Sequence, residues 1–289
     1  MRLRTLAMLA PALLVIVGLF LGGLALAIRQ SFGLDLPDGE GAWTWRYYRA
    51  VASDPEFRAG LLLTLRTAVV ATLLSAAVGL GLALAVRAQV RRRPWLSALL
   101  QLPIMVPHLT LAVMLTHLLA ESGLLARVAF AAGAIEVPSD FPELVQDRFA
   151  LSVILAYFLK ETPFVAVMVL ALLVRTGAEF EEAARMLGAS AWQRFRFVTL
   201  PLAAPALLSS ALLVFALVFS AFEVPYLLGR TYPAMLAVIA QRKFLAPDLT
   251  ERPEAMAIAV AMTLLAVLLA ALYLRLARAI VGVSRPVVF

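Results

Sequence analysis

Six long apolar segments constrain this chain more than any other feature of its sequence. A helix crosses the hydrocarbon core of a bilayer with about 20 mainly apolar residues. Six segments of the 289-residue chain meet this requirement: residues 5–28, 61–86, 96–119, 149–174, 201–229 and 255–277. Hydrophobic residues make up 63% of the chain and charged residues 15%, whereas soluble domains are about half apolar and a quarter charged. The sequence therefore predicts an all-α, polytopic membrane protein with six transmembrane helices.

The distribution of charge predicts how these helices are oriented. If the N-terminus is cytoplasmic, the inside segments hold 13 basic residues and three acidic ones, Glu179, Glu181 and Glu182. The outside segments then hold 13 acidic residues and fewer basic ones. The positive-inside rule places both termini in the cytoplasm. Because the basic residues are spread along the loops, orientation also explains the net charge of +7 without a nucleic-acid partner.

The first span has two interpretations. Arg2 and Arg4 precede its apolar run and Ala25-Leu26-Ala27 follows, as in a cleaved signal peptide. The apolar core of a signal peptide is shorter, at about 7–15 residues, so the length favours a retained anchor. We therefore expect an N-terminal helix and external loop over residues 1–60, a transmembrane domain over 61–279 and a cytoplasmic tail over 280–289.

A patterned cytoplasmic loop, residues 175–200, joins the fourth and fifth spans. Four apolar residues in it recur at the i, i+3, i+4, i+7 spacing of one helix face. They are Phe180, Ala183, Ala184 and Leu187. Gly188 follows at the position that commonly ends a helix, and Ser190 with Gln193 predicts a capping box for a second short helix on the membrane surface. The pattern alone is compatible with an interfacial hairpin or with a docking surface.

The same loop carries a specific motif. It reads E-A-A-x-x-x-G from Glu182 to Gly188 and, after nine residues, V-x-L-P from Val198 to Pro201. This arrangement resembles the signature loop of the permease subunits of binding-protein-dependent ABC importers, of the type I or MetI-like family. The similarity covers about residues 61–277. One departure is the sequence Arg-Thr-Gly at 175–177, where many relatives have an isoleucine-proline turn.

The resemblance implies that the loop is a coupling helix that sits in a cleft of a separate ATP-binding subunit. Eight residues are then expected to take part in coupling: Glu181, Glu182, Ala183, Ala184, Arg185, Gly188, Leu200 and Pro201. Glu182 would meet a basic group of the ATPase, the two alanines would allow close approach, and Gly188 would permit the turn after the helix.

The resemblance also implies the partners of the chain. They are two nucleotide-binding ATPase subunits, a second and different permease subunit, an extracytoplasmic solute-binding protein and the lipid of a bacterial inner membrane. The chain has no G-x-x-x-x-G-K-[ST] phosphate loop. We therefore expect no enzymatic activity and no cofactor in this chain, with ATP and Mg bound by the partner ATPase.

Four residues within the spans are candidates for the translocation path: Lys160, Glu161, Pro163 and Glu223. An ionisable group at mid-membrane costs about 2.5–3.5 kcal/mol on insertion scales, so it normally faces protein or water. Lys160 and Glu161 are adjacent and cannot face each other on a helix, so each needs its own partner, and Pro163 should kink the helix. The family resemblance implies that this region lines the path; a buried structural network is the alternative. Glu223, near the outer end of the fifth span, either receives a cationic solute or pins a helix end.

Other functions receive less support from the sequence. A secondary transporter or channel working without an ATPase would not need this loop, and its usual repeats and paired broken helices are not visible. An intramembrane enzyme would need catalytic or metal-binding residues grouped at one depth in the membrane, and no such group is apparent in the sequence. His108 and His117 are nine residues apart and face opposite sides of a straight helix.

The substrate is the least constrained property. The fourth and fifth spans are most similar to the subgroup of permeases that carry polyamines, iron, or inorganic and organic anions. Glu161 and Glu223 favour a cation such as a polyamine, whereas Lys160 favours an anion.

Overall fold

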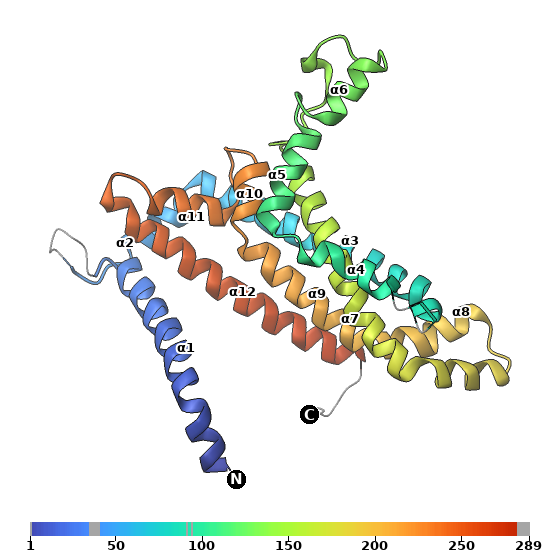
Figure 1. Ribbon diagram of the computed structural model, residues 1–289. Helices are drawn as coiled ribbons and strands as arrows, with labels where there is room; N and C mark the ends of the chain where they lie inside the picture. Colours follow the sequence, from blue (N-terminus) through green and yellow to red (C-terminus); the bar gives the residue numbers. More distant parts are fainter. Residues whose placement is uncertain (1, 35–40, 91, 94, 282–289) are drawn as a thin grey trace. The chain divides into compact units, whose positions relative to one another are not determined.

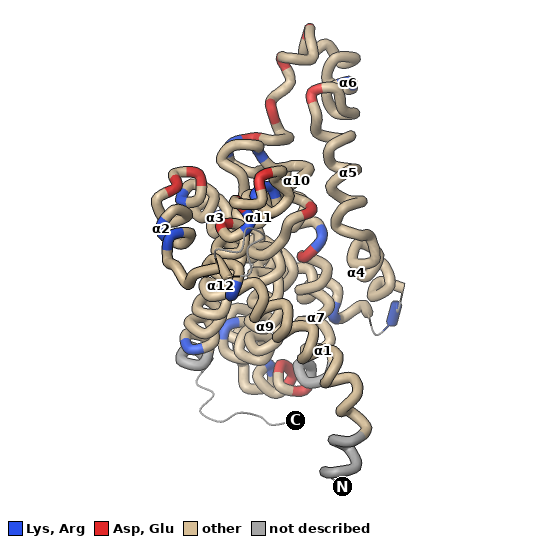
Figure 2. Tube along the Cα trace, turned by 90° about the vertical axis from the view of Figure 1, so that its left-hand side faces the viewer, with Lys and Arg blue, Asp and Glu red and all other residues tan. Residues whose placement is uncertain are grey.

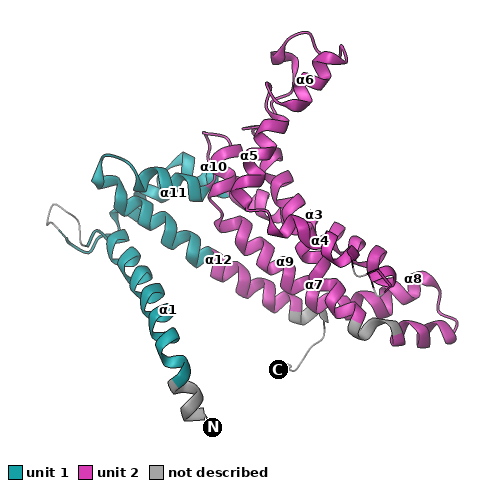
Figure 3. Ribbon diagram, in the orientation of Figure 1, with its two compact units in different colours: residues 1–61, 236–265 teal, residues 62–235, 266–289 magenta. Residues whose placement is uncertain are grey.

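The structure, a computed structural model, describes residues 2–34, 41–90, 92–93 and 95–281 (Figure 1). Every regular element in these residues is helical. The chain divides into two compact units, which Figure 3 shows in different colours. The first contains residues 1–61 and 236–265, and the second contains residues 62–235 and 266–289.

The described residues include six helical segments that are long and apolar enough to cross a membrane. They are Met8–Ser31, Pro55–Val90, His108–Ala131, Leu151–Val174, Ala191–Ser220 and Leu249–Ala277. In Figure 2, charged residues gather toward the helix ends and connecting segments. The number of spans agrees with the prediction, but the third and fifth differ in their limits.

The first unit is formed by an N-terminal segment and a segment from the last quarter of the chain. Its helices are α1 (Arg2–Ser31), α2 (Arg46–Ser53), the start of α3 (Pro55–Val90), α11 (Leu236–Phe244), the short η3 (Leu249–Glu251) and the start of α12 (Arg252–Val281). The end of α1 and the residue that follows it contact α2 and the segment that leads into it. Phe32 stacks on Trp43 with ring centroids 3.9 Å apart, and the hydroxyls of Ser31 and Tyr48 are 2.7 Å apart.

The second unit is built around α7. Its elements in chain order are the rest of α3, α4 (Trp95–Met105), α5 (His108–Leu119), α6 (Leu124–Ala131), η1 (Pro138–Asp140), α7 (Leu151–Met186), α8 (Ala191–Arg194), the π-helical turn η2 (Phe195–Thr199), α9 (Leu200–Ser220), α10 (Glu223–Leu228) and the end of α12. Helix α7 packs against α4, α5, α9 and α10. Val153, Tyr157, Val165 and Val169 are buried on it at spacings of four or eight residues, as one face of a helix requires.

The prediction of one continuous helix over residues 96–119 is wrong. The segment is split into α4 and α5, with Val106 and Pro107 between them. Pro107 has no N–H to donate, and it disfavours a helical backbone at the residue before it. The apolar segment long enough to span is instead His108–Ala131, which joins α5 to α6, while Trp95–Met105 is a shorter apolar helix.

The predicted fifth span, residues 201–229, is too long. Helix α9 ends at Ser220, Ala221 is extended, and α10 is a separate helix. Pro225 cannot donate a hydrogen bond to the carbonyl of Ala221 four residues earlier, so a single helix cannot keep its full ladder here. The carbonyl of Leu228 instead accepts bonds from the Gln146 backbone at 2.8 Å and from the Ser152 hydroxyl at 3.2 Å. These bonds hold the end of α10 against the start of α7.

Candidate functional site

Helix α7 runs beyond the predicted membrane exit at residue 174. The first short helix expected in the loop is therefore not separate, because α7 is continuous from Leu151 to Met186. The expected stop at Gly188 is confirmed. Gly188 has φ +81°, and the N–H groups of Gly188 and Ala189 donate to the carbonyls of Arg185 and Ala184, both at 3.0 Å. Glycine adopts the left-handed backbone conformation readily, so it suits the position at which N–H groups after a helix bind its last carbonyls.

The predicted capping box after this turn is also confirmed. Ser190 Oγ accepts from the Gln193 backbone N–H at 3.3 Å, and Gln193 Oε1 accepts from the Ser190 N–H at 2.8 Å. The Trp192 and Phe195 rings lie on one side, with centroids 5.5 Å apart. However, α8 has only four residues and passes through η2 into α9. The second expected helix is thus the beginning of a long apolar helix.

The apolar stripe at the end of α7 has little covering it in this chain. The exposed fractions are 57% for Phe180 and 89% for Leu187, and Met186 beside the stripe is 83% exposed. Ala183 is exposed and Ala184 is half-buried. Large side chains this exposed at the tip of a hairpin are typical of a surface that a partner covers.

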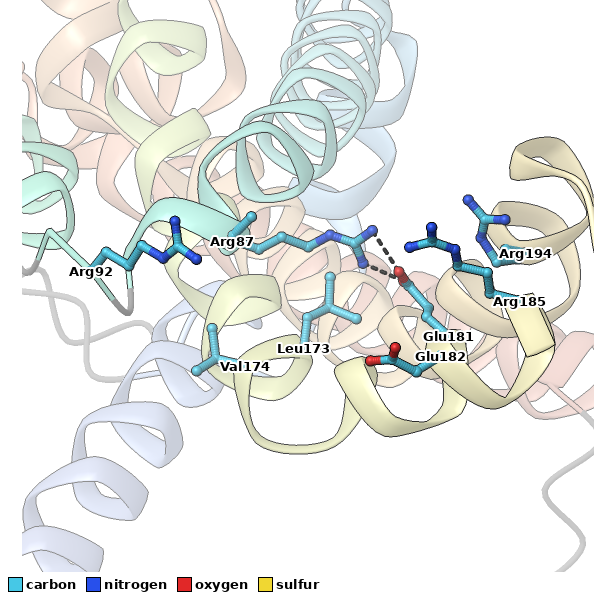
Figure 4. Close-up of a pocket in the computed structure, with 9 residues that line it drawn as sticks. Arg87, Arg92, Leu173, Val174, Glu181, Glu182, Arg185 and Arg194 are labelled. Atoms are coloured by element: carbon cyan, nitrogen blue, oxygen red, sulfur yellow. Dashed lines mark hydrogen bonds and ion pairs between the residues drawn. The ribbon is translucent and has the colours of Figure 1, made fainter.

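The neighbouring carboxylates Glu181 and Glu182 have different surroundings, which Figure 4 shows. Arg87 of α3 donates to both carboxylate oxygens of Glu181. Its Nη1 donates to Oε1, and its Nη2 donates to Oε2 at 2.9 Å. The Thr199 hydroxyl donates to the same carboxylate. Partial burial opposes ionisation of Glu181, but the bonds from Arg87 and Thr199 outweigh it and lower its pKa. Glu182 is exposed and forms no ion pair with any residue that the structure describes.

A cavity of about 920 Å³ lies beside these carboxylates. Its lining residues come from α3, α7, α8 and the segment after α3: Arg87, Ala88, Arg92, Leu173, Val174, Glu181, Glu182, Arg185 and Arg194. Four arginines against two glutamates leave the lining positively charged. Leu200 and Pro201, the last two predicted coupling residues, form the first turn of α9.

The charged pair in the middle of α7 is buried and fully engaged. Lys160 is 7% exposed and Glu161 is 6% exposed. The Lys160 ammonium donates to the carbonyls of Pro103 at 3.2 Å, Ile104 at 2.7 Å and Val106. Glu161 is 3.0 Å from the ring of His108. The expectation that each charge has its own partner is confirmed.

These contacts explain how the interruption between α4 and α5 is tolerated. A broken transmembrane helix frees backbone carbonyls, which are costly in an apolar environment unless another group binds them. Lys160 supplies that group. Helix α7 itself is continuous through Pro163, so the interruption lies in its neighbour. Pro103 and Pro107 were the sequence signal for it.

Glu223, the last candidate for the translocation path, forms no hydrogen bond with this network among the described residues. Glu223 is exposed at the start of α10 and forms no ion pair within the described residues. His108 has Glu161 as its partner. In the part of the chain that the structure describes, no three His, Asp or Glu side chains are grouped as metal ligands.

The arrangement defines a helical protein with six segments, among the described residues, that are long and apolar enough to cross a membrane, and with an exposed hairpin between α7 and α9. A bacterial ABC transporter that imports the acidic polysaccharide alginate has the same fold, with a TM-score of 0.76, 18% identity and coverage of 96% of this chain and 95% of that one. The fold is that of the MetI-like ABC permeases. Residues 77–282 match the family described as the inner membrane component of binding-protein-dependent transport systems, and the chain belongs to this family.

Two relatives illustrate its place in the family. The sulfate transport system permease protein CysT of Escherichia coli (strain K12) is 31% identical over 173 residues, which cover 60% of this chain and 59% of CysT. The molybdenum transport system permease protein ModB of Mycobacterium tuberculosis (strain ATCC 25618 / H37Rv) is 29% identical over 177 residues, covering 60% and 62%. The chain thus spans about three fifths of the length of these relatives. It is a multi-pass protein of the bacterial inner membrane.

Proposed function

We propose that this chain is the permease subunit of an ATP-driven importer, that it forms half of the solute path, and that it couples to a separate ATPase through the loop 175–200. One observation carries the proposal: the stripe from Phe180 to Leu187 is exposed at the end of α7, with Glu182 free beside it. An apolar surface rimmed by one free charge suits a docking interface with an apolar core and a polar rim.

The proposed assembly contains two ATPase subunits, a second permease subunit and an extracytoplasmic solute-binding protein. ATP and Mg would be bound by the ATPase, so hydrolysis would not occur in this chain. The fold neighbour that imports alginate has also been solved in complex with an alginate pentasaccharide-bound periplasmic protein. This complex supports a binding protein as a partner.

For the substrate, we propose a small inorganic anion. Glu161 and Lys160, the buried charges that favour a cation and an anion respectively, both have partners within the chain, so neither decides the charge of the solute. The names of the relatives specify sulfate and molybdenum transport. Equilibrium binding of sulfate, molybdate and spermidine to the solute-binding protein encoded beside this chain tests the proposal. Tight binding of spermidine alone would overturn it.

Co-purification tests the coupling role. The chain is expressed with the ATPase encoded beside it, either as the wild type or as Glu182→Arg. We expect the ATPase to purify with the wild type and to be lost from the variant, because a reversed charge would face the basic group expected in the ATPase cleft. Glu143→Arg, an exposed acid in the external segment, is the matched control and should retain the ATPase.

Two outcomes would contradict the proposed function. If Glu182→Arg binds and stimulates the ATPase as the wild type does, the loop is not the coupling surface. If the purified chain transports solute in liposomes without ATP, the protein is a self-sufficient carrier rather than an importer subunit.

A further inference from the structure

Three helical segments that are distant in sequence meet at the Glu181 carboxylate. Arg87 is in the last turn of α3, Glu181 is near the end of α7, and Thr199 is in η2, directly before α9. The guanidinium of Arg87 binds both carboxylate oxygens, and Thr199 donates to one of them. A two-pronged arginine–carboxylate pair restricts relative orientation as well as distance. We call these three residues the Glu181 clamp.

The clamp is sheltered and is continuous with the turn of the coupling loop. The side chains of Arg87 and Glu181 are 30% and 20% exposed, and Thr199 is 2% exposed. Partly buried charges are screened by salt much less than exposed ones. Arg194 also acts favourably on the Glu181 carboxylate, and it donates to the carbonyl of Ala189 at 2.8 Å. The residue after Gly188 is therefore held to the same cluster.

Glu181 and Glu182 point in different directions. Successive residues of an α-helix are about 100° apart around its axis. Glu181 faces Arg87, whereas Glu182 has no such contact (Figure 4). Docking at the exposed side of the hairpin therefore leaves the clamp intact. The clamp links the helix that carries the stripe to α3 through Arg87 and to η2 through Thr199.

We propose that Glu181 is a positioning residue that locks the coupling loop to α3 and α9, so that movement of the loop displaces two transmembrane helices with it. This inference rests on the proposed function. It separates two tasks within one motif: the stripe and Glu182 bind the ATPase, and the Glu181 clamp transmits its motion. Loss of the clamp uncouples ATP hydrolysis from transport without releasing the ATPase.

Charge reversal in the complete importer tests the clamp. The complex with its ATPase and binding protein is reconstituted in liposomes, and the number of solute molecules transported per ATP hydrolysed is measured. We expect Arg87→Glu and Glu181→Arg to lower this ratio about tenfold each, as for loss of a close coupled pair. The double variant, which restores opposite charges, should return to within about twofold of the wild type. The ATPase should co-purify with all three.

Milder variants and a control complete the test. Glu181→Gln and Thr199→Val keep the side-chain volume, so they report on the clamp if a charge reversal prevents folding; both should lower the ratio. Arg93→Glu, an exposed arginine that follows the same helix, should leave it unchanged. An unchanged ratio in the clamp variants, or a double variant no better than its worse parent, overturns the clamp. Failure of the wild type to retain the ATPase overturns the proposed function itself, and the clamp's role with it.

Discussion

The middle of α7 and its cytoplasmic end each carry two adjacent charged residues, and their environments differ. In the middle, Lys160 and Glu161 are both bound by the α4–α5 segment. At the end, Glu181 is bound by Arg87 and Thr199, whereas Glu182 is exposed. Within a membrane, a charge must find a partner in its own chain or assembly. At the cytoplasmic surface, water can solvate one charge until a partner arrives.

This difference indicates that adjacent charged residues on one transmembrane helix can have separate roles, in stability and in contact with a partner. The buried pair is explained by the interruption of its neighbour, which Pro103 and Pro107 signal in the sequence and which the structure locates between Met105 and His108. In the surface pair, Glu181 is bound within the chain and Glu182 is exposed. The pair is therefore suited to pass movement of a partner at Glu182 to the helices that bind Glu181. The predictions below test this contrast, from the largest expected effect to the smallest.

Lys160→Met should be the most destabilising change. It would leave the carbonyls of Pro103, Ile104 and Val106 without their donor and the carboxylate of Glu161 without a neighbouring cation. Breaking a buried charged network typically costs about 3–5 kcal/mol. Unfolding of the purified protein in detergent would measure the loss.

The second lysine of the chain is the matched control. Lys243 pairs with Glu254 at 2.7 Å, and its side chain is 18% exposed. Lys243→Met should cost less, about 1 kcal/mol, because its ion pair is partly exposed to water and lies outside the buried network of α7. Equal losses in the two variants would remove the distinction between buried and partly exposed charges.

Gly188→Ala should cost about 1–2 kcal/mol, because an alanine is strained at a left-handed position. The added Cβ would meet no atom within 4 Å, so backbone strain is the cause. Gly133→Ala is a matched control, since Gly133 has φ +72° and equally open surroundings in the external segment. We expect similar losses of stability, but only Gly188→Ala should reduce stimulation of the ATPase. Reduced stimulation in both variants would argue against a specific role for the loop turn.

Ser190→Ala should destabilise the protein by about 1 kcal/mol, the usual cost of losing an N-cap. It removes the acceptor for the Gln193 N–H at the start of α8. Ser190→Asp keeps an acceptor at this position and should stay close to the wild type. Thermal unfolding of the three proteins side by side would check the order.

Acidification should weaken the Glu181 clamp by the smallest amount. The pKa of Glu181 is lowered in the folded protein, so its stabilising contribution is present above the ordinary carboxyl pKa. The contribution is lost as the pH falls through the lowered value. The difference in unfolding free energy between the wild type and Glu181→Gln, about 1 kcal/mol or less, should therefore shrink between pH 7 and pH 3. A difference that grew on acidification would contradict this sign.

Local signals in the sequence determined the helical class, the number of spans, the glycine stop and the capping box. Each depends on composition or on residues within one or two helical turns, and the Gly188 turn and the Ser190 cap show how reliable such signals are. Only the tertiary structure established that the third span is split, that Lys160 binds the freed carbonyls, and that Glu181 rather than Glu182 binds Arg87. These pairings join residues 54–94 positions apart. Periodicity along the chain cannot specify them, because they depend on which helix faces meet in the packed unit.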